Sequence, residues 1–131
     1  MAFNGYLIKV GNYTIPLTFM KLESYKSMPN QRQDLDSYRD ADGYLHRTVL
    51  PHTATKLEFE TPYLFRSQMQ SLIQGIRINF TSEIARQCEV TYYDEETDSY
   101  KTGTFYMPGT MEYQVYNRDI YAPTRFAFIE Y

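Results

Sequence analysis

The most informative stretch of this chain is SMPNQRQDLDSYRDADGYLHRTVLPHTAT, residues 27–55. It is long and polar, and Asp42-Gly43 lies near its middle between two runs that can form strands, residues 36–41 and 44–50. Asp-Gly is a strong signal for a two-residue hairpin turn of type I′, which needs positive φ at both central positions. Because the flanking runs are too polar for a buried pair, we predict a hairpin arm over residues 27–55 that protrudes from a compact body.

The segments after the arm have the patterns of a half-buried strand and one helix. Residues 54–61 alternate, with Leu57 and Phe59 on one face and charged residues on the other. Thr61 is a good N-cap and Pro62 fits the first helical position. An apolar stripe at helical spacing follows, and Gly75 is a natural stop, so we predict a helix over residues 62–75. The stripe consists of Phe65, Met69, Leu72, Ile73 and Ile76.

The rest of the chain is predicted to form short strands. We expect them at residues 5–10, 13–17, 19–26, 76–80, 83–93 and 100–107, with an acidic turn at 94–99 and a closing pair at 111–117 and 124–131. So many strands with one amphipathic helix predict a mainly β fold, a β-sandwich or partly closed β-barrel with the helix packed on it. The length of 131 residues fits a single domain, 1–131.

Composition narrows the class of function. The net charge is −3, which argues against a nucleic-acid binder with a strongly basic surface. The 14 Tyr and 8 Phe suit either β-sheets in general or subunit interfaces. The first residues lack the pattern of a signal peptide, and no apolar run is long enough for a membrane span, so we expect no membrane association.

No motif for catalysis, a metal or a cofactor is recognisable. The acidic run around Gly43 fails the EF-hand spacing, because Tyr38 and Val49 would occupy essential ligand positions. His46 and His52 are six residues apart, unlike a zinc HExxH pair, and Cys88 fits a small buried side chain. We therefore expect a non-enzymatic protein without cofactor or metal.

The arm carries charge of both signs. Positive side chains lie beside four Asp, and two interpretations stay open: a solvated surface, or complementary charge between neighbouring copies. Taking the second, the candidate assembly interface consists of Arg32, Asp34, Asp36, Tyr38, Arg39, Asp40, Asp42, Tyr44, His46, Arg47 and Leu50.

The chain resembles small structural proteins of bacteriophage tails. The most familiar part is SYRDADGYLHRTVLPHTATKLEFETPYL, residues 37–64, and the order of short N-terminal strands, polar hairpin, one helix and terminal hairpins extends the resemblance over nearly the whole chain. It resembles especially the tail-tube and distal-tail group and an uncharacterised tail-protein family from phages of Gram-positive bacteria. No motif separates tube, distal-tail and baseplate roles.

The resemblance implies a structural role by self-assembly. Tail-tube-like proteins form rings, commonly hexameric, around a channel through which DNA passes without specific binding. Residues 34–50 would then be the arm to the adjacent ring, and Glu58, Glu60 or residues 94–99 would face the lumen. Implied partners are further copies and other tail proteins, in a virion tail assembled in the host bacterial cytoplasm.

A second hypothesis stays open beside the first. A monomeric β-rich module could bind carbohydrate or protein, with exposed Tyr92, Tyr93 or Tyr100 stacking on the ligand.

Overall fold

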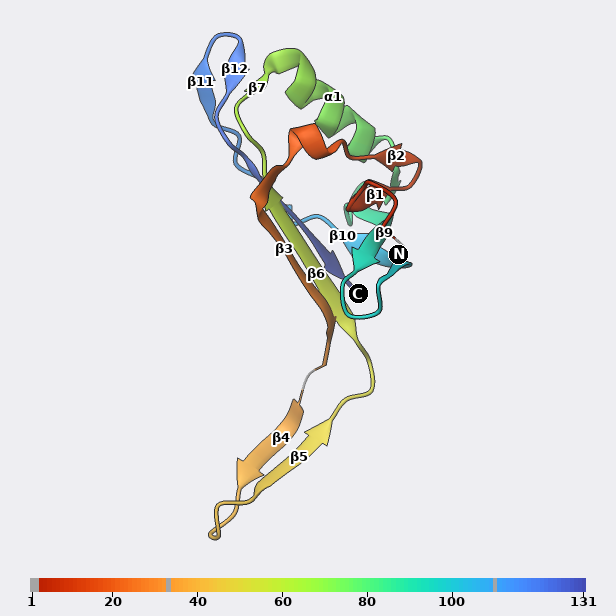
Figure 1. Ribbon diagram of the computed structural model, residues 1–131, viewed down its shortest axis with the longest axis vertical. Coiled ribbons are helices and arrows are strands. Elements are labelled where there is room, and N and C mark those ends of the chain that lie inside the picture. Colours follow the sequence, from red (N-terminus) through yellow and green to blue (C-terminus); the bar gives the residue numbers. More distant parts are fainter. Residues whose placement is uncertain (1–2, 33, 110) are drawn as a thin grey trace.

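The computed structural model describes residues 3–32, 34–109 and 111–131, and is shown in Figure 1. About half of the described residues lie in strands, and the same part of the chain has one α-helix and a short 3-10 helix. In chain order the elements are β1 (Ile8–Val10), β2 (Tyr13–Thr14), η1 (Leu17–Phe19), β3 (Lys21–Gln31), β4 (Asp34–Arg39), β5 (Leu45–Val49), β6 (Ala54–Glu60), β7 (Leu64–Phe65), α1 (Arg66–Arg77), β8 (Phe80–Ser82), β9 (Gln87–Asp94), β10 (Ser99–Tyr106), β11 (Val115–Asn117), β12 (Ile120–Tyr121) and β13 (Arg125–Glu130).

An eight-stranded sheet forms the body. Its order is β2-β1-β9-β10-β13-β6-β3, and β8 also pairs with β9. β9 and β10 pair along eight positions and β13 and β6 along five, but β10 and β13 share only two, Phe105↔Glu130 and Tyr106↔Ile129. This short junction divides the sheet into two halves, which lets them face each other across a common core in a sandwich-like arrangement.

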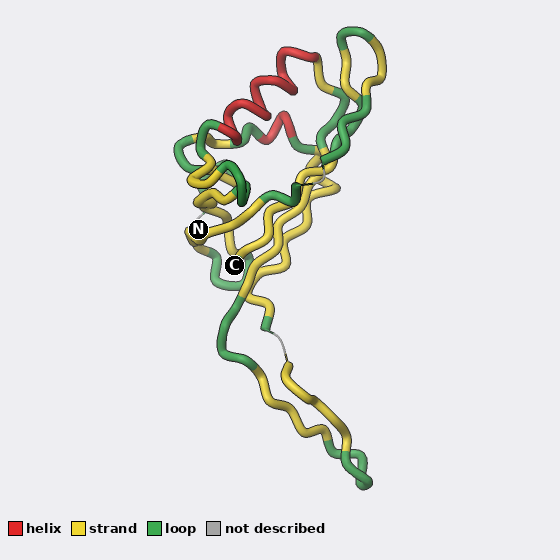
Figure 2. Tube along the Cα trace, turned by 180° about the vertical axis from the view of Figure 1, so that it is seen from behind, coloured by secondary structure: helices red, strands yellow, loops and turns green. Residues whose placement is uncertain are grey.

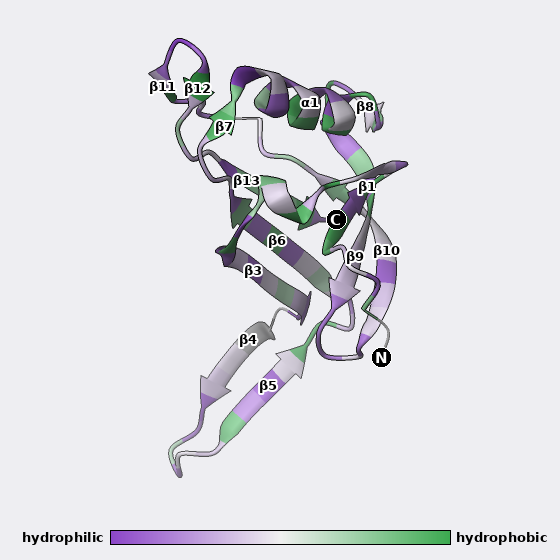
Figure 3. Cartoon of the chain, turned by 45° about the horizontal axis from the view of Figure 1, so that its top comes forward, coloured by the Kyte–Doolittle hydropathy of each residue, from purple (hydrophilic) through white to green (hydrophobic). Residues whose placement is uncertain are grey.

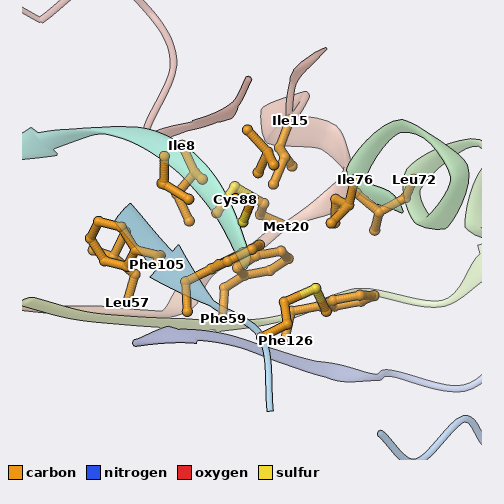
Figure 4. Close-up of a cluster of buried hydrophobic side chains, with 14 of the residues drawn as sticks. Ile8, Ile15, Met20, Leu57, Phe59, Leu72, Ile76, Cys88, Phe105 and Phe126 are labelled. Carbon is orange, nitrogen blue, oxygen red and sulfur yellow. The ribbon is translucent and has the colours of Figure 1, made fainter. Parts of the chain in front are cut away.

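The core lies between the two halves, as Figure 4 shows. Strand alternation supplies it: Leu57 and Phe59 of β6 are buried while their charged neighbours face outward. Phe126 of β13 stacks on Phe59, with ring centroids 5.4 Å apart. Cys88 and Val90 of β9 contribute from the opposite half, so the prediction of a buried Cys88 is confirmed.

The helix covers one open side of this core through Met69, Leu72 and Ile76. Its predicted end near residue 75 is two residues short, and its predicted start is wrong, because α1 begins at Arg66. The backbone N–H of Phe65 donates to Gln68 Oε1 (3.0 Å) at the true start. Thr61 instead lies directly after β6 and is buried, and its hydroxyl oxygen accepts the N–H of Thr124 at 3.0 Å.

The sheets are open, as the mainly β, sandwich-like alternative predicted, and the described strands do not close into a barrel. Two strand predictions are wrong. Residues 76–80 are mostly the helix end and a turn, and residues 111–117 do not pair with the last strand. β11 pairs with β12 in a separate three-stranded sheet, order β11-β12-β7, while β13 enters the body sheet between β10 and β6.

The polar stretch is the outer part of one long hairpin that begins in the body. β3 and β6 pair within the main sheet, and β4 and β5 continue the same hairpin as a separate two-stranded ribbon. Residues 27–31 and 54–55 therefore belong to the body sheet, and the protruding part is shorter than the predicted 27–55. Figures 1 and 2 show the ribbon projecting along the long axis of the molecule.

Candidate assembly surfaces

The arm is a β-ribbon exposed to solvent. Tyr38 pairs with His46 and Arg39 with Leu45, and every residue of β5 is exposed. Figure 3 shows the ribbon mainly in polar colours with short hydrophobic segments. The exposed apolar residues are Tyr38, Tyr44, Leu45, Val49 and Leu50. β5 therefore contributes no buried side chain to the ribbon, and a two-stranded hairpin by itself is at best marginally stable in water.

The turn at the tip differs from the predicted type I′ turn. The N–H of Gly43 donates to Asp40 O (3.0 Å), and the N–H of Asp40 donates to Tyr44 O (2.9 Å). Gly43 has φ of 86°, whereas Asp42 does not have positive φ. The loop is therefore a three-residue connection in which a turn is followed by a left-handed glycine. The Asp-Gly signal located the hairpin correctly but predicted a loop one residue too short.

Side chains stiffen the tip of the arm. Asp40 Oδ1 accepts the backbone N–H groups of Asp42 and Tyr44, each at 3.0 Å. Asp40 Oδ2 lies 2.8 Å from His46 Nε2, and this hydrogen bond is the main cause of the lowered pKa of Asp40. The His46 ring stacks on Tyr38 at 4.9 Å, and Arg39 donates to Gly43 O at 2.9 Å.

Asn30, the second-to-last residue of β3, joins the root of the arm to the body by hydrogen bonds. Asn30 has φ of 55°, a conformation that asparagine tolerates better than most residues. Its Nδ2 donates to Asp94 Oδ2 at 3.0 Å and to Glu96 Oε1 at 3.2 Å. The left-handed bend thus turns the Asn30 side chain toward the turn between β9 and β10.

Asp94 is the buried charged residue at the root of the arm. Its side chain is fully buried, and Lys101 Nζ lies 2.8 Å from Oδ2. Burial by itself would raise the pKa of Asp94, but hydrogen bonds from Lys101, from Asn30 and from the Glu96 backbone N–H outweigh it and lower the pKa to about 2. The carboxylate is therefore charged at neutral pH and holds three groups together.

β6, the strand that returns from the arm, is hydrogen-bonded to the body beside Asn30. The Thr55 N–H donates to Glu130 Oε1 at 2.9 Å, and the Thr55 hydroxyl lies 3.1 Å from Tyr92 Oη. Thr55 Oγ1 also accepts the N–H of Asn30 at 3.3 Å. Between Thr55 and β5, His52 Nε2 lies 2.8 Å from the Tyr131 carbonyl oxygen. Both strands of the arm thus leave the body from fixed positions.

The structure brings part of the predicted interface together. Tyr38, Arg39, Asp40, Asp42, Tyr44 and His46 cluster at the tip, whereas Arg32 and Leu50 lie near the root and Arg47 lies in β5 between the two groups. The side chains of Asp34 and Asp36 lie outside the described part. Sequence reasoning missed the root residues Asn30, Thr55, Asp94 and Lys101. No local pattern joins them, because they come together only through the sheet.

Two of the tyrosines expected to stack on a ligand are engaged within the chain, and a third is buried. Tyr92 is buried and therefore cannot stack, which corrects that expectation. Tyr93 donates its hydroxyl proton to Asp98, and this bond raises the pKa of Tyr93 to about 12. Tyr100 stacks on Tyr6 with centroids 4.5 Å apart.

The predicted lumen residues differ in their surroundings. Glu58 is paired with Arg125 and lies 3.9 Å from Lys56, so its charge is balanced locally. Glu95, Glu96 and Asp98 of the acidic turn are exposed.

The described residues form neither a metal-ligand cluster nor a membrane-spanning helix. Within residues 3–32, 34–109 and 111–131, no group of three or more His, Cys, Asp or Glu side chains is placed to hold a metal ion. Among the described helices, none has the length and apolar character needed to cross a membrane.

The fold and the protruding ribbon define a mainly β protein built from open sheets, with one covering helix and an arm. The chain belongs to the family of unknown function DUF6711, which matches residues 1–131.

Solved structures with a similar fold come from gene transfer agent (GTA) particles. One is a chain of the tail of an empty GTA particle, computed with helical refinement and C6 symmetry. It has a TM-score of 0.56 and 14% identity, over 99% of this chain and 95% of that chain. Another is a chain of the virion of a native GTA particle, with a TM-score of 0.54, 15% identity and the same coverage. At these identities the likeness establishes a shared fold. No curated protein matches the sequence.

Proposed function

We propose that this protein is a non-enzymatic structural subunit of a phage-tail-like assembly, built from stacked rings of identical copies. The observation that carries this proposal is the β4–β5 ribbon. An isolated two-stranded hairpin is at best marginally stable in water, and this one exposes Tyr38, Tyr44 and Leu45 at its end. A second protein surface that covers the ribbon would supply the missing buried face.

The similar chains support the same proposal. They belong to the tail and the virion of GTA particles, and one of those assemblies has helical and C6 symmetry. A fold that serves in such a tail is compatible with a ring of six copies here, in the tail of a virion or of a prophage-derived particle. We propose other tail proteins as the partners at the two ends of the stack, and the host bacterial cytoplasm as the place of assembly.

The open edge of the main sheet is a candidate contact within a ring. β3 pairs with β6 on one side only, so its other side presents unpaired backbone groups. The stretch available is limited, because the β3–β6 register shifts between Lys21 and Lys26 and again between Met28 and Gln31, and because Pro29 has no N–H. We place the pairing segment near residues 26–28.

If DNA passes through the ring, the exposed turn between β9 and β10 is the better candidate for its lining. Glu95, Glu96 and Asp98 are exposed there, whereas Glu58 is balanced by Arg125. Negative charge at a lumen would reduce adhesion of the DNA backbone.

Replacing the ribbon tests the proposal. Residues 34–49 are exchanged for a short Asn-Gly turn, and the full chain and the variant are compared by light scattering over a hundredfold concentration range, followed by negative-stain imaging. We expect rings or stacks from the full chain and smaller species from the variant, with unchanged near-ultraviolet circular dichroism. A monomeric full chain at every concentration, or a variant that assembles equally well, would overturn the proposal.

A further inference from the structure

A second exposed apolar surface lies at the end of the molecule opposite the arm. The sheet β11-β12-β7 occupies that end, beside the start of α1 (Figure 1). Three residues at this end form what we call the aromatic patch: Tyr63, just before β7, Phe65 of β7 and Tyr116 of β11, which are 60%, 59% and 65% exposed. Large apolar side chains gathered in this way are typical of a protein-binding surface.

The aromatic patch is an ordered surface. The rings of Tyr63 and Tyr116 meet edge to face with centroids 5.2 Å apart. Together with Ile120 they line a hollow of about 330 Å³. Phe65 pairs with Ile120 in the sheet and lines the neighbouring hollow, of about 510 Å³, with Arg66 and Asp119 among its other residues. Both hollows are shallow and open to solvent, and each has at least one aromatic side chain in its wall against which an apolar side chain of a partner can pack.

Arg66 fixes the border of the patch. Its Nη2 donates to Arg118 O and its Nη1 to Tyr121 Oη, both at 3.0 Å. The side chain of Arg118 is 93% exposed, and its Nε lies 3.6 Å from the Asp119 carboxylate. The patch therefore has a positively charged border that one carboxylate balances only in part.

The arm of a second copy has the matching properties. Its tip presents Tyr44, 72% exposed, and Leu45 as apolar side chains. Asp40 and Asp42 outnumber Arg39 in the same loop, so the tip carries a net negative charge beside its apolar residues. The aromatic patch offers apolar hollows and exposed arginine, which makes the two surfaces complementary in both respects.

We propose that the aromatic patch is the docking site for the arm tip of the next copy of this chain. This inference rests on the proposed function and names the surface that receives the arm. Because the two surfaces lie at opposite ends of the long axis, the contact joins different copies (Figure 1). A contact between two different surfaces repeats head to tail from copy to copy, and it builds an open stack when successive copies do not close into a ring.

Engineered cysteines test this contact directly. Cys88 is the one natural cysteine and is buried, so it leaves a low background of reaction. The double variant Tyr44→Cys/Tyr116→Cys is treated with a short bismaleimide crosslinker and analysed on a denaturing gel. The single variants are one set of controls. The pair Tyr44→Cys/Ile84→Cys is the other, because Ile84 is 100% exposed and lies in the β8–β9 turn, outside the patch.

We expect a ladder of covalent dimers, trimers and larger species from the arm–patch pair alone. Assemblies seen by light scattering without that ladder would overturn the docking site while leaving the proposed function standing. An equally strong ladder from the Ile84 pair would also overturn it. A chain that stays monomeric throughout, with no crosslinks, would overturn the proposed function and the docking site together.

Discussion

The arm and the β9–β10 hairpin have the same side-chain hydrogen bond in their turns, but they differ in how far their strands are buried. In each turn an aspartate Oδ1 accepts the N–H two residues further on, Asp42 N for Asp40 (3.0 Å) and Glu96 N for Asp94 (2.9 Å). Yet β9 alternates between buried and less buried residues, whereas β5 is exposed throughout. Turn chemistry therefore makes a hairpin, and the apolar alternation of its strands decides whether the chain buries it in its own core.

The aspartates of the two turns also differ in burial and in their partners. Asp94 is buried and bound to Lys101, and Asp40 is partly exposed and bound to His46. In the body, Asp94 stabilises the fold, and in the arm, Asp40 stabilises the turn at the tip.

The largest expected difference between the hairpins is in stability. Phe105→Ala, in β10, removes a fully buried ring and should lower the free energy of unfolding by about 3–5 kcal/mol. Leu45→Ala, in β5, should change it by less than about 0.5 kcal/mol, because the side chain is already exposed. Urea denaturation followed by circular dichroism measures both, and a similar loss in the two variants would show that the arm packs on the body.

The next largest effect concerns the place where the two hairpins meet. Asn30→Ala removes the bond to the buried Asp94 and should cost about 1–3 kcal/mol, to which the left-handed backbone adds about 1 kcal/mol of strain. Asn30→Gly loses the same bond without the strain and is the matched control.

Both variants should also widen the range of arm orientations. Small-angle X-ray scattering of the monomeric fraction measures this range as an altered distribution of long interatomic distances. An unchanged distribution in both variants would mean that Asn30 does not hold the arm.

A smaller effect separates the two aspartates by pH. The pKa of Asp94 is lowered from 3.8 to about 2, so its contribution to stability is present above 3.8 and is lost as the pH falls toward 2. Asp94→Asn should therefore flatten the dependence of unfolding free energy on pH between 4 and 2. Asp40→Asn should leave that slope nearly unchanged, because solvent screens the exposed pair. Equal flattening in both variants would contradict the division between body and arm.

The smallest effect is confined to the arm tip. Gly43 has φ of 86° and open space around its missing Cβ, so Gly43→Ala adds only backbone strain of about 1–2 kcal/mol. Hydrogen exchange at the Gly43 and Tyr44 amides should accelerate, because each donates to Asp40 across the turn. The global unfolding free energy should not change, and a global loss would mean that the arm folds cooperatively with the body.

Several parts of the body could be predicted because their signals are local. The period-two pattern of Leu57 and Phe59 found β6, and the helical stripe found α1 within a few residues. The predicted start of α1 was wrong. Thr61 has the side chain of an N-cap, but its hydroxyl oxygen instead accepts the N–H of Thr124, next to the main sheet. The pairing of β13 with β6 was missed because its partners lie some 70 residues apart, beyond any local pattern.

A polar hairpin within an apolar β body could be predicted from the residues alone, since turn propensity and the alternation of side chains act over a few residues. The point and direction in which that hairpin leaves the body depend on contacts between distant segments. Asn30, Thr55, Asp94 and Tyr92 meet at its root through sheet pairing between distant segments. Their hydrogen bonds form only after the core has brought the strands together, because a buried carboxylate such as Asp94 is stable only when its partners are in place.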